Sequence, residues 1–393
     1  MEKVLLIGID TRSMLNSALK LDYDIFSTSY FSTSDTPTIK NQKIILNESD
    51  GESCGIFEDN FKSSNIIEMS RDFIDEVDYI IPISGVSPDD FSKKDQKKIL
   101  GNRDVGEVEN KFRFFKKIRN EFLTPMTFSV SDVDEAHEIS NNYPDKQFIL
   151  KPLQGSGGYN INMLDNANKI EFNDSEFMMQ EYVSGVSLSS SVLSTKSDAK
   201  TVTNTRLFTE NDFEKSNSFV YVGNALPLTG KSVMGDVKDI DNVNNEMCDA
   251  SENLICKFNL IGSNGVDYIL NEDGLYVIEI NPRLQGTFEC VEKSFGINML
   301  DAHIKACNGE IIKIPKAKYY SFKKIIYSPT RMKYSKINLD NIYDLPHPGS
   351  ITEKREPLLT IIDKDESFEN LYKKVESASE IVNKSARINQ LDA

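Results

Sequence analysis

The sequence predicts a mixed fold, with an α/β domain at the N-terminus followed by an α+β region of antiparallel sheets. Over about the first 100 residues, apolar strand-like runs alternate with helical patterns, which is typical of a doubly wound parallel sheet. Further along, a glycine-rich loop lies between two strand-like runs, and a short turn near residue 272 joins two more. Parallel and antiparallel sheets are therefore both expected in this chain.

Length and composition indicate a soluble globular protein. A chain of 393 residues is long enough for about two or three domains, each with its own core. Its 39% hydrophobic and 27% charged residues are typical of that class. The net charge of −16 argues against a nucleic-acid partner and against an anionic membrane surface. No apolar run approaches the roughly 18 to 20 residues of a membrane helix, and the run at residues 4–9 is too short for a secretory signal.

The cysteines and histidines also indicate where the protein works. The five cysteines are odd in number and contain no CxxC pair, which is typical of a reducing compartment. The three histidines are far apart in the sequence, so a histidine metal cluster is not expected. We therefore expect a cytoplasmic protein.

The first predicted strand ends at a candidate ligand-binding edge. Residues 4–9 form a continuous apolar run, as a buried parallel strand requires. Asp10 and Arg12 follow it, and ligands often bind at this edge of open α/β sheets, so both are candidate substrate contacts. The alternative is a helix-start turn with a solvated arginine, and the missing GxGxxG motif argues against a dinucleotide site. Further strands of this unit are expected at Ile25–Ser27, Ile44–Leu46 and Val77–Ile83.

A helix is predicted from about Asp104 to Phe122. Its apolar residues recur at helical spacing and are expected in the core: Val108, Phe112, Phe115, Ile118 and Phe122. Lys111 lies beside this stripe and, as a lone lysine, is interpreted as a solvated side chain when it is taken by itself.

The glycine-rich segment follows a strand that ends in a lysine. The strand Gln147–Pro152 contains Lys151, and the loop Gly155-Ser156-Gly157-Gly158 leads into a second strand at Asn160–Leu164. Glycines let backbone amides approach phosphate oxygens, and Lys151 can supply positive charge. The segment is not a Walker loop, because the GK[ST] ending and the following helix are missing. The alternative is a plain flexible turn.

The remaining chain alternates predicted strands and helices. A strand at Phe177–Val183 precedes a serine-rich strand, where serines alternate partly with apolar residues and suggest one polar face: Ser187, Ser189, Ser190, Ser191 and Ser194. Three helices are expected later, at Asp239–Phe258, at Asn298–Asn308 and from an N-cap at Ser367 onward.

The hairpin around residue 272 brings acidic side chains together. Two strand-like runs flank Glu272-Asp273-Gly274, and Gly274 suits the left-handed third position of a three-residue loop. If Asn271 faces Leu275, then Asp267 faces Glu279, with Asn281 two residues further on the same face.

Two carboxylates that face each other across a hairpin repel, so this arrangement is poor for stability alone. A divalent cation between them would remove the repulsion, and carboxylate and amide oxygens suit magnesium, which usually also takes phosphate oxygens. The alternative is a surface hairpin with ordinary charges.

In their order along the chain, these motifs resemble the ATP-grasp superfamily of ATP-dependent ligases. The resemblance runs from about Lys111 to Gly309 and is strongest in Ile278–Arg283 (IEINPR), which is similar to that superfamily's metal-binding strand. Residues 4–100 resemble the Rossmann-like domain that often precedes it. The order of the motifs is the specific feature: two lysines, the glycine loop, Gln-Glu-Tyr-Val, and then Asp with Glu-x-Asn-x-Arg.

The resemblance implies a role for each motif. Lys111 and Lys151 would contact the ATP phosphates, with the stem of Lys151 also near the purine, and the loop Gly155–Gly158 would close over the phosphates. Arg283, together with Lys151, would neutralise charge during phosphoryl transfer. Adenine contacts would come from Glu181, Tyr182 and Val183, and magnesium, or alternatively manganese, would bind to Asp267, Glu279 and Asn281. Where many family members have a ribose-binding glutamate, this chain has Ser187, Leu188 and Ser189, so the ribose contact is left open.

The implied activity is that of an ATP-dependent ligase. Such an enzyme joins a small-molecule carboxylate to an amine through an acyl phosphate and releases ADP and phosphate. A bicarbonate-activating enzyme of the carbamoyl-phosphate or carboxylase type is one alternative, although no biotin-carrier or glutaminase segment is apparent. A non-catalytic ATP-binding protein is another, although the retained metal-ligand set with Arg283 argues against it.

The expected domain organisation has four parts. A Rossmann-like domain over residues 1–105 precedes a small lid subdomain over 106–180, an ATP-grasp subdomain with the metal site over 181–318, and a C-terminal extension over 319–393. The extension is expected either to pack beside the ATP domain or to support a homodimer, and its Lys323, Lys324 and Arg331 are interpreted as solvated charges.

Overall fold

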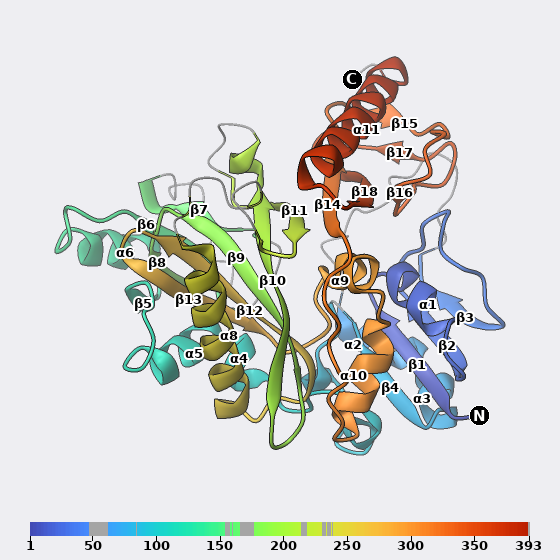
Figure 1. The fold of residues 1–393 in the computed structure, drawn as a ribbon, viewed down its shortest axis with the longest axis horizontal. Coiled ribbons are helices and arrows are strands. Elements are labelled where there is room, and N and C mark those ends of the chain that lie inside the picture. Colours follow the sequence, from blue (N-terminus) through green and yellow to red (C-terminus); the bar gives the residue numbers. More distant parts are fainter. Residues whose placement is uncertain are drawn as a thin grey trace.

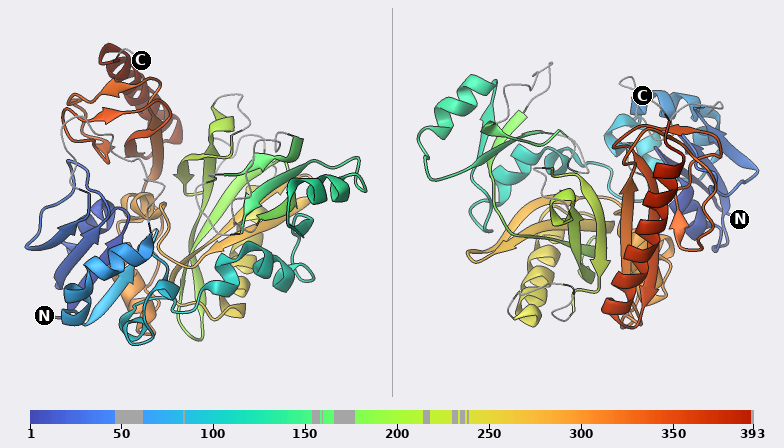
Figure 2. Two further views of the ribbon diagram at one scale, coloured as in Figure 1. Left: turned by 180° about the vertical axis from the view of Figure 1, so that it is seen from behind. Right: turned by 90° about the horizontal axis from the view of Figure 1, so that it is seen from above.

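A computed structural model describes residues 1–46, 62–83, 85–153, 158, 160–165, 177–213, 218–229, 233, 237 and 239–391 (Figure 1). A small antiparallel sheet and an N-terminal parallel sheet lie at opposite ends of the molecule, with a large antiparallel sheet between them (Figures 1 and 2). The predicted mixture of α/β and α+β architecture is confirmed.

The N-terminal sheet is parallel, as the alternating pattern predicted. Its strands β1 (Lys3–Gly8), β2 (Asp24–Ser29), β3 (Asn41–Ile44) and β4 (Tyr79–Pro82) lie in the order β3-β2-β1-β4. Leu5 and Ile7 of β1 share a core with α2 (Ser63–Met69) and α3 (Arg71–Glu76). Val4 and Leu6 point to the other side and pack with α1 (Arg12–Ala18), α9 (Phe288–Phe295) and α10 (Met299–Cys307). Because both faces are covered, β1 is apolar from Val4 to Ile7.

The connection to the next part contains two short 3-10 helices and two α-helices. These are η1 (Pro88–Asp90), η2 (Asp95–Lys98), α4 (Gly106–Glu109) and α5 (Lys111–Ile118). The single helix predicted over 104–122 is therefore wrong. The helix is interrupted at Asn110, whose side chain accepts a hydrogen bond from the Arg113 N–H (3.0 Å) and caps α5. The break rotates α5, so that Phe114 is buried while Phe112 and Phe115 are only partly buried and stack on each other.

The small antiparallel sheet has the order β5-β8-β6-β7. Its strands are β5 (Thr127–Val130), β6 (Phe148–Pro152), β7 (Asn162–Met163) and β8 (Phe177–Glu181). The helix α6 (Val133–Ser140) contributes Ala136 to a core shared with Phe148 and Met179. We call this part the small sheet below.

The large sheet has eight antiparallel strands in the order β13-β12-β9-β10-β11-β14-β18-β16. They are β9 (Val186–Ser194), β10 (Ala199–Thr209), β11 (Tyr221–Leu226), β12 (Gly262–Asn271), β13 (Gly274–Asn281), β14 (Tyr320–Tyr327), β16 (Ile342–Tyr343) and β18 (Pro357–Asp365). A further 3-10 helix, η4 (Glu210–Asp212), follows β10. Helix α8 (Ile240–Lys257) covers one face through Val243, Met247 and Leu254. On the opposite face, Leu193, Val202 and Leu226 pack in a core with α9 and α10.

The C-terminal segment continues this sheet, because β14 pairs with β11 and β18 pairs with β14. Helix α11 (Phe368–Ile388) packs on these strands, and Ser367 accepts the Asn370 N–H (3.4 Å) as the predicted N-cap. The short strands β15 (Met332–Lys333) and β17 (Ile351–Thr352) form a separate pair. The side chains of Lys323 and Lys324 are only 12% and 13% exposed and each forms an ion pair, so the prediction that they are solvated is wrong.

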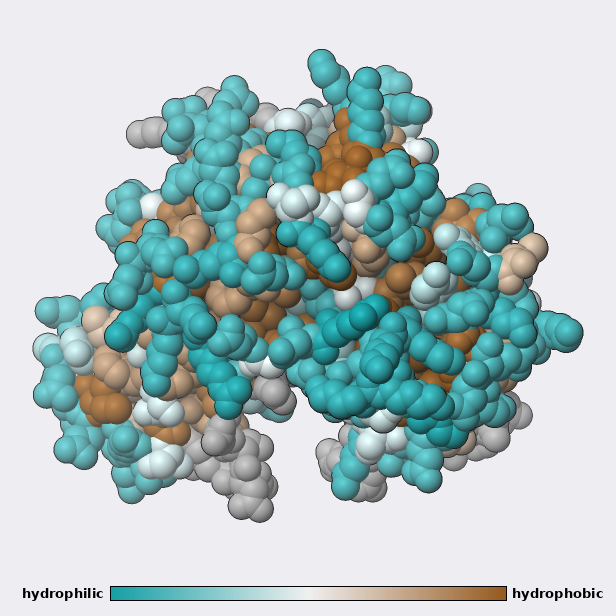
Figure 3. All heavy atoms as spheres, turned by 90° about the horizontal axis from the view of Figure 1, so that it is seen from below, coloured by the Kyte–Doolittle hydropathy of each residue, from teal (hydrophilic) through white to brown (hydrophobic). Residues whose placement is uncertain are grey.

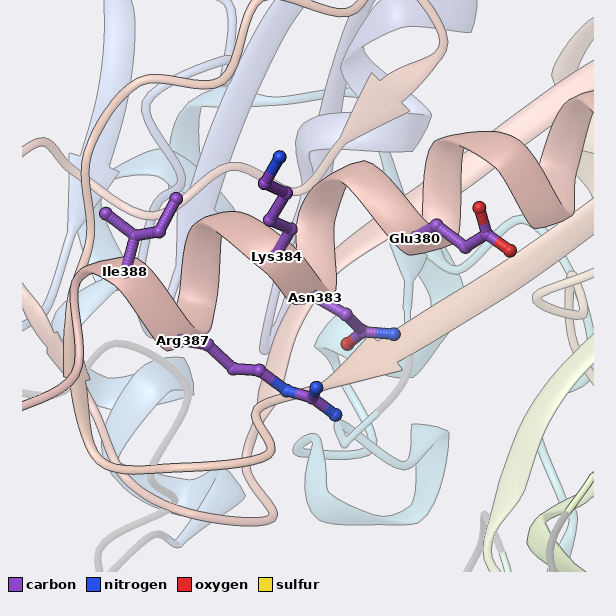
Figure 4. Close-up of a pocket in the computed structure, with 5 residues that line it drawn as sticks. All are labelled: Glu380, Asn383, Lys384, Arg387 and Ile388. Carbon is purple, nitrogen blue, oxygen red and sulfur yellow. The ribbon is translucent and has the colours of Figure 1, made fainter.

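The surface seen from below is mostly hydrophilic, with patches of hydrophobic side chains across its middle (Figure 3). No helix in the described part of the chain is both long and apolar enough to cross a bilayer. A surface hollow of about 440 Å³ lies along the last turns of α11 (Figure 4) and is lined by Glu380, Asn383, Lys384, Arg387 and Ile388.

His303 of α10 joins the large sheet to the N-terminal domain, and it should make folding acid-sensitive. Its Nδ1 accepts the Ser263 N–H (2.8 Å), its Nε2 lies 3.1 Å from the Leu100 carbonyl oxygen, and burial lowers its pKa to about 4. In the unfolded chain this imidazole binds a proton near pH 6.5, whereas in the folded protein it stays neutral down to about pH 4. The free energy of unfolding should therefore fall by about 3 kcal/mol as the pH drops from 6.5 to 4. His303→Gln should flatten this part of the pH dependence in urea unfolding, whereas His137→Gln, on the partly exposed α6, should not.

Candidate active site

The hairpin of β12 and β13 places Asp267 directly opposite Glu279, as predicted. The route to this register differs from the predicted one. Asn271 pairs with Gly274, so the turn has two central residues instead of three, and Gly274 adopts a positive φ of 139°. The pairing of Asn271 with Leu275 is therefore wrong.

A β-bulge compensates for the shorter turn. Continued without interruption, the observed turn would set Asp267 opposite Ile278, but the register shifts by one residue between Tyr268 and Asp267. The shift lets Val277 and Ile280 both face the core under α8, while Glu279 and Asn281 face the other side with Asp267. The functional register thus depends on the bulge as well as on the turn.

Hydrogen bonds connect the residues at this end of the hairpin. Oδ1 of Asp267 accepts a hydrogen bond from the Ser189 hydroxyl (2.6 Å), and Oδ2 accepts one from the Asn281 side-chain amide (2.9 Å). Asn281 Oδ1 in turn accepts Arg283 Nη2 (3.4 Å). The Lys111 Nζ lies 3.2 Å from Glu279 Oε2, which brings α5 against β13. Five predicted site residues therefore come together with Ser189.

The two opposed carboxylates have different electrostatic surroundings. Burial, and then the charge of Glu279, raises the pKa of Asp267 to about 7. Burial also disfavours ionisation of Glu279, but the charges of Lys111 and Lys151 outweigh it and lower the pKa of that carboxyl. The negative charge of Glu279 therefore disfavours ionisation of Asp267, and a cation bound beside Asp267 would offset this repulsion.

Two lysines from different elements meet beside Glu279. Lys151, on β6 of the small sheet, is 3% exposed, and burial followed by the charge of Lys111 lowers its pKa to about 8. The backbone N–H of Lys111 donates to the Leu153 carbonyl (3.2 Å), which ties the start of α5 to the end of β6. The interpretation of Lys111 as a solvated side chain is wrong, because its side chain is 11% exposed. Two cations sharing one carboxylate favour an additional anion.

Part of the predicted glycine loop lies outside the described residues, namely Gly155, Ser156 and Gly157. Gly158 is described and has a positive φ of 76°. A Cβ at this position would lie 1.9 Å from the Phe219 carbonyl oxygen, so only glycine fits there.

The predicted adenine segment links the small sheet to the large one. The carboxylate of Glu181 accepts the Met126 N–H (3.1 Å) and forms an ion pair with Lys146. The Tyr182 N–H donates to the Gln147 carbonyl (2.8 Å), and Val183 is buried. Because these contacts engage the side chain of Glu181, an adenine contact in this segment is expected to use backbone groups.

Sequence reasoning missed the support beneath Asp267. Gln285 Nε2 donates to Ser189 Oγ (3.0 Å), and Ser191 Oγ donates to Gln285 Oε1 (3.2 Å). Gly265 makes room for this chain of hydrogen bonds, because a Cβ there would lie 1.7 Å from Gln285 Nε2. The available signal was the alternation of Ser187, Ser189 and Ser191, which places all three on the face of β9 that carries Asp267 in β12.

Asp10 and Arg12 belong to a second cluster of charges. Arg12 is 1% exposed and contacts Asp344 (Nε to Oδ1, 2.6 Å) and Glu289 (Nη2 to Oε1, 2.9 Å), so the solvated interpretation is wrong. Asp10 accepts the Arg12 N–H (2.9 Å), and burial, followed by Asp344, raises its pKa to about 7. These contacts join the N-terminal sheet to α9 and to the segment after β16. Substrate contact by Asp10 and Arg12 stays a prediction.

The donor set of the hairpin fits a hard divalent cation. Two carboxylates and one amide supply oxygens, and magnesium prefers such ligands together with phosphate oxygens. The raised pKa of Asp267 is a further sign of fit, since a bound cation would stabilise its ionised form. Among the described residues, no group of three or more His, Cys, Asp or Glu side chains could hold a metal ion. The fit therefore rests on the two carboxylates and Asn281.

Comparisons with known proteins show what this chain is similar to. Residues 108–287 match the family model of an ATP-grasp domain. An uncharacterized protein of Methanocaldococcus jannaschii is 27% identical over 370 residues, which cover 92% of this chain and 88% of that protein. The tyramine–L-glutamate ligase of the same organism is 26% identical over 216 residues, or 55% of this chain and 59% of the ligase.

Solved structures resemble almost the whole chain. The N5-carboxyaminoimidazole ribonucleotide synthetase of Thermotoga maritima has a TM-score of 0.70 at 14% identity and covers 97% of this chain and 98% of its own. A biotin carboxylase of Campylobacter jejuni has a TM-score of 0.69 at 13% identity, over 96% of this chain and 91% of its own. The chain thus shares its fold with these two enzymes. Residues 108–287 are similar to an ATP-grasp domain, as the order of the motifs predicted.

Proposed function

We propose that the protein is an ATP-dependent ligase that joins a carboxylate to an amine through an acyl phosphate. The observation that carries the proposal is the meeting of two opposed carboxylates with Lys111, Lys151 and Arg283. Phosphoryl transfer to a carboxylate needs neutralised charge and close positioning, and no protein nucleophile is required. These five residues supply both.

Each residue has a defined part in this proposal. Lys111 and Lys151 hold the ATP phosphates, and Gly158 closes the chain over them together with the rest of the glycine loop. Glu181, Tyr182 and Val183 border the adenine. Asp267, Glu279 and Asn281 would hold magnesium, or alternatively manganese, which when bound supplies Lewis-acid stabilisation of the phosphate oxygens. Arg283 faces the transferred group, since Asn281 Oδ1 and the Leu284 carbonyl anchor its guanidinium at 3.4 and 3.3 Å.

An amine acceptor has direct support from one relative. The tyramine–glutamate ligase is named for joining an amine to an amino acid, and its similarity includes 55% of this chain. The acyl phosphate would be attacked by the amine nitrogen, giving an amide, ADP and phosphate. The substrates are accordingly a small carboxylate and a small amine.

Bicarbonate is the second candidate for the activated acid. The synthetase and carboxylase structures that resemble 96–97% of the chain are named for carboxylation chemistry, which supports this alternative. It differs from the first proposal in one measurable way. ADP release would then depend on bicarbonate alone and would not need an organic carboxylate.

The test is a screen for phosphate release over carboxylates and bicarbonate, with hydroxylamine added to trap an acyl phosphate as a hydroxamate. Carboxylate-dependent ADP release with a matching hydroxamate is expected. Bicarbonate-dependent release without any organic acid would favour the second candidate. ATP binding without ADP release under every condition would contradict both and leave a non-catalytic ATP-binding protein.

Lys151→Met should weaken ATP binding by about 10- to 100-fold, because one charge-assisted contact to phosphate is lost. Methionine fills the buried volume of Lys151, so packing is nearly preserved. Isothermal titration of ATP measures the effect. Lys200→Met is the matched control, since Lys200 on β10 is exposed and pairs only with Glu252 in the described contacts. Unaltered ATP affinity in Lys151→Met would remove this lysine from the site.

A further inference from the structure

A small cavity lies where the N-terminal sheet meets the loop after β13. It has a volume of about 30 Å³, which holds a group of about two non-hydrogen atoms. Pro82 at the end of β4, Val86 and Leu284 give it apolar walls, and Glu109 and Arg283 contribute its charged groups. The carboxyl edge of a parallel sheet is a common place for a ligand. The cavity therefore adjoins the candidate active site through Arg283.

Glu109 connects this cavity to the phosphate end of the site. It is the last residue of α4, two positions before Lys111, whose Nζ contacts Glu279. Ser87 Oγ donates to Glu109 Oε2 (3.2 Å) and holds the carboxylate in place. A group bound between Glu109 and Arg283 would thus lie next to the proposed phosphoryl-transfer centre.

The charges around Glu109 favour a cation that can lose a proton. Burial raises the pKa of Glu109, and the negative charges of Asp89 and Asp90 in η1 raise it further. The positive charge of Arg283 acts in the opposite direction and lowers this pKa. Two N–H groups of Arg283 are directed to Asn281 and to the Leu284 carbonyl. A partly buried carboxylate with a raised pKa is a suitable proton acceptor.

We propose that this cavity receives the amine end of the acceptor substrate and that Glu109 is the general base that deprotonates it. The inference rests on the proposed function and extends it by naming the nucleophile's site. The ligand class is a primary amine with an unbranched reacting end, because the cavity has room for little more than the nitrogen and its first carbon.

In the proposed step the amine nitrogen loses two protons and gains one bond to carbon. The amine enters as an ammonium ion and transfers one proton to the Glu109 carboxylate. The freed nitrogen lone pair attacks the acyl carbon of the acyl phosphate, and the C–O bond to the phosphate breaks with its electron pair. The phosphate leaves with the second nitrogen proton, and the product is the amide.

The test compares two nucleophiles of equal size, hydroxylamine and methylamine. Hydroxylamine is weakly basic and largely unprotonated at neutral pH, whereas methylamine arrives protonated and needs a base. Glu109→Gln should lower the rate of methylamide formation by about 100-fold and leave hydroxamate formation within about twofold. Glu107→Gln removes an exposed carboxylate of the same helix, paired with Lys117, and should change neither rate.

The outcomes separate this inference from the proposed function. Equal losses with both nucleophiles would give Glu109 a positioning role and overturn the base assignment, as would an undiminished methylamide rate. A wild-type enzyme that forms hydroxamate but no methylamide would overturn the amine cavity and leave the ligase proposal standing. A wild-type enzyme without carboxylate-dependent ADP release would overturn the proposed function, and this inference with it.

Discussion

Replacing Glu279 or Asp267 with alanine is expected to lower magnesium-dependent ADP release by about 1000-fold or more, because each variant leaves one carboxylate for the cation. Both residues face the same end of the hairpin, and Asp267 bears the repulsion that a cation would relieve. Initial rates of ADP release over a magnesium titration measure the effect. Higher magnesium should not restore either variant to the wild-type rate.

Glu272→Ala is the matched control, because Glu272 lies in the turn of the same hairpin and is exposed. It should retain full activity. Circular dichroism and melting temperatures of all three variants would show that the fold is intact. Wild-type ADP release by both site variants would remove the metal assignment, and loss in only one would remove that residue from the ligand set.

The hairpin shows why register is partly readable from sequence. The turn residues and the alternation predicted that Asp267 faces Glu279, and this pairing is confirmed. The predicted loop was one residue too long, and the bulge inserts one residue on β13, so the two differences cancel. The bulge allows both Val277 and Ile280 to be buried under α8. This burial is tertiary packing, which cannot be predicted from the residues of the turn alone.

Charges that pair over long sequence separations were the least predictable feature. Arg12 pairs with Glu289 and Asp344, which lie more than 270 residues away, as well as with Asp35. Nothing near Arg12 in the sequence indicates that it is buried. Lys111 was likewise placed by its resemblance to a motif, while its contact with Glu279 follows from the folded arrangement of α5 on β13. Local pattern identifies such residues as candidates, and only the fold decides whether they meet.

The break at Asn110 illustrates the same limit inside one element. Apolar spacing predicted a single helix with Phe112 and Phe115 in the core, but Asn110 caps a new helix and turns Phe114 inward instead. A capping side chain was readable, since asparagine favours N-caps. The consequence for the site could not be predicted from the sequence. The interruption ends α4 at Glu109 and starts α5 at Lys111, so the carboxylate of Glu109 lies on one side of Asn110 and Lys111 lies on the other.

Replacing Arg283 with methionine is expected to lower the rate of phosphoryl transfer by about 1000-fold while changing ATP affinity by no more than about threefold. Hydrogen bonds to Asn281 and to the Leu284 carbonyl anchor the guanidinium, which in the proposed function neutralises the charge that develops in the reaction. Arg283→Lys should recover only part of the rate, because an ammonium group cannot make both contacts in the same plane. Single-turnover ADP formation at saturating ATP and carboxylate measures the chemical step apart from binding.

Arg331→Met is the control, since Arg331 is 43% exposed and pairs with Glu353 far along the chain from the hairpin. Parallel losses of ATP affinity and rate would give Arg283 a role in nucleotide binding. A third result is informative because Arg283 also lines the cavity that contains Glu109. If Arg283→Met formed hydroxamate at the wild-type rate and lost only methylamide formation, the arginine would act with Glu109 on the amine, and the charge on the phosphoryl group would have to be neutralised by Lys111 and Lys151.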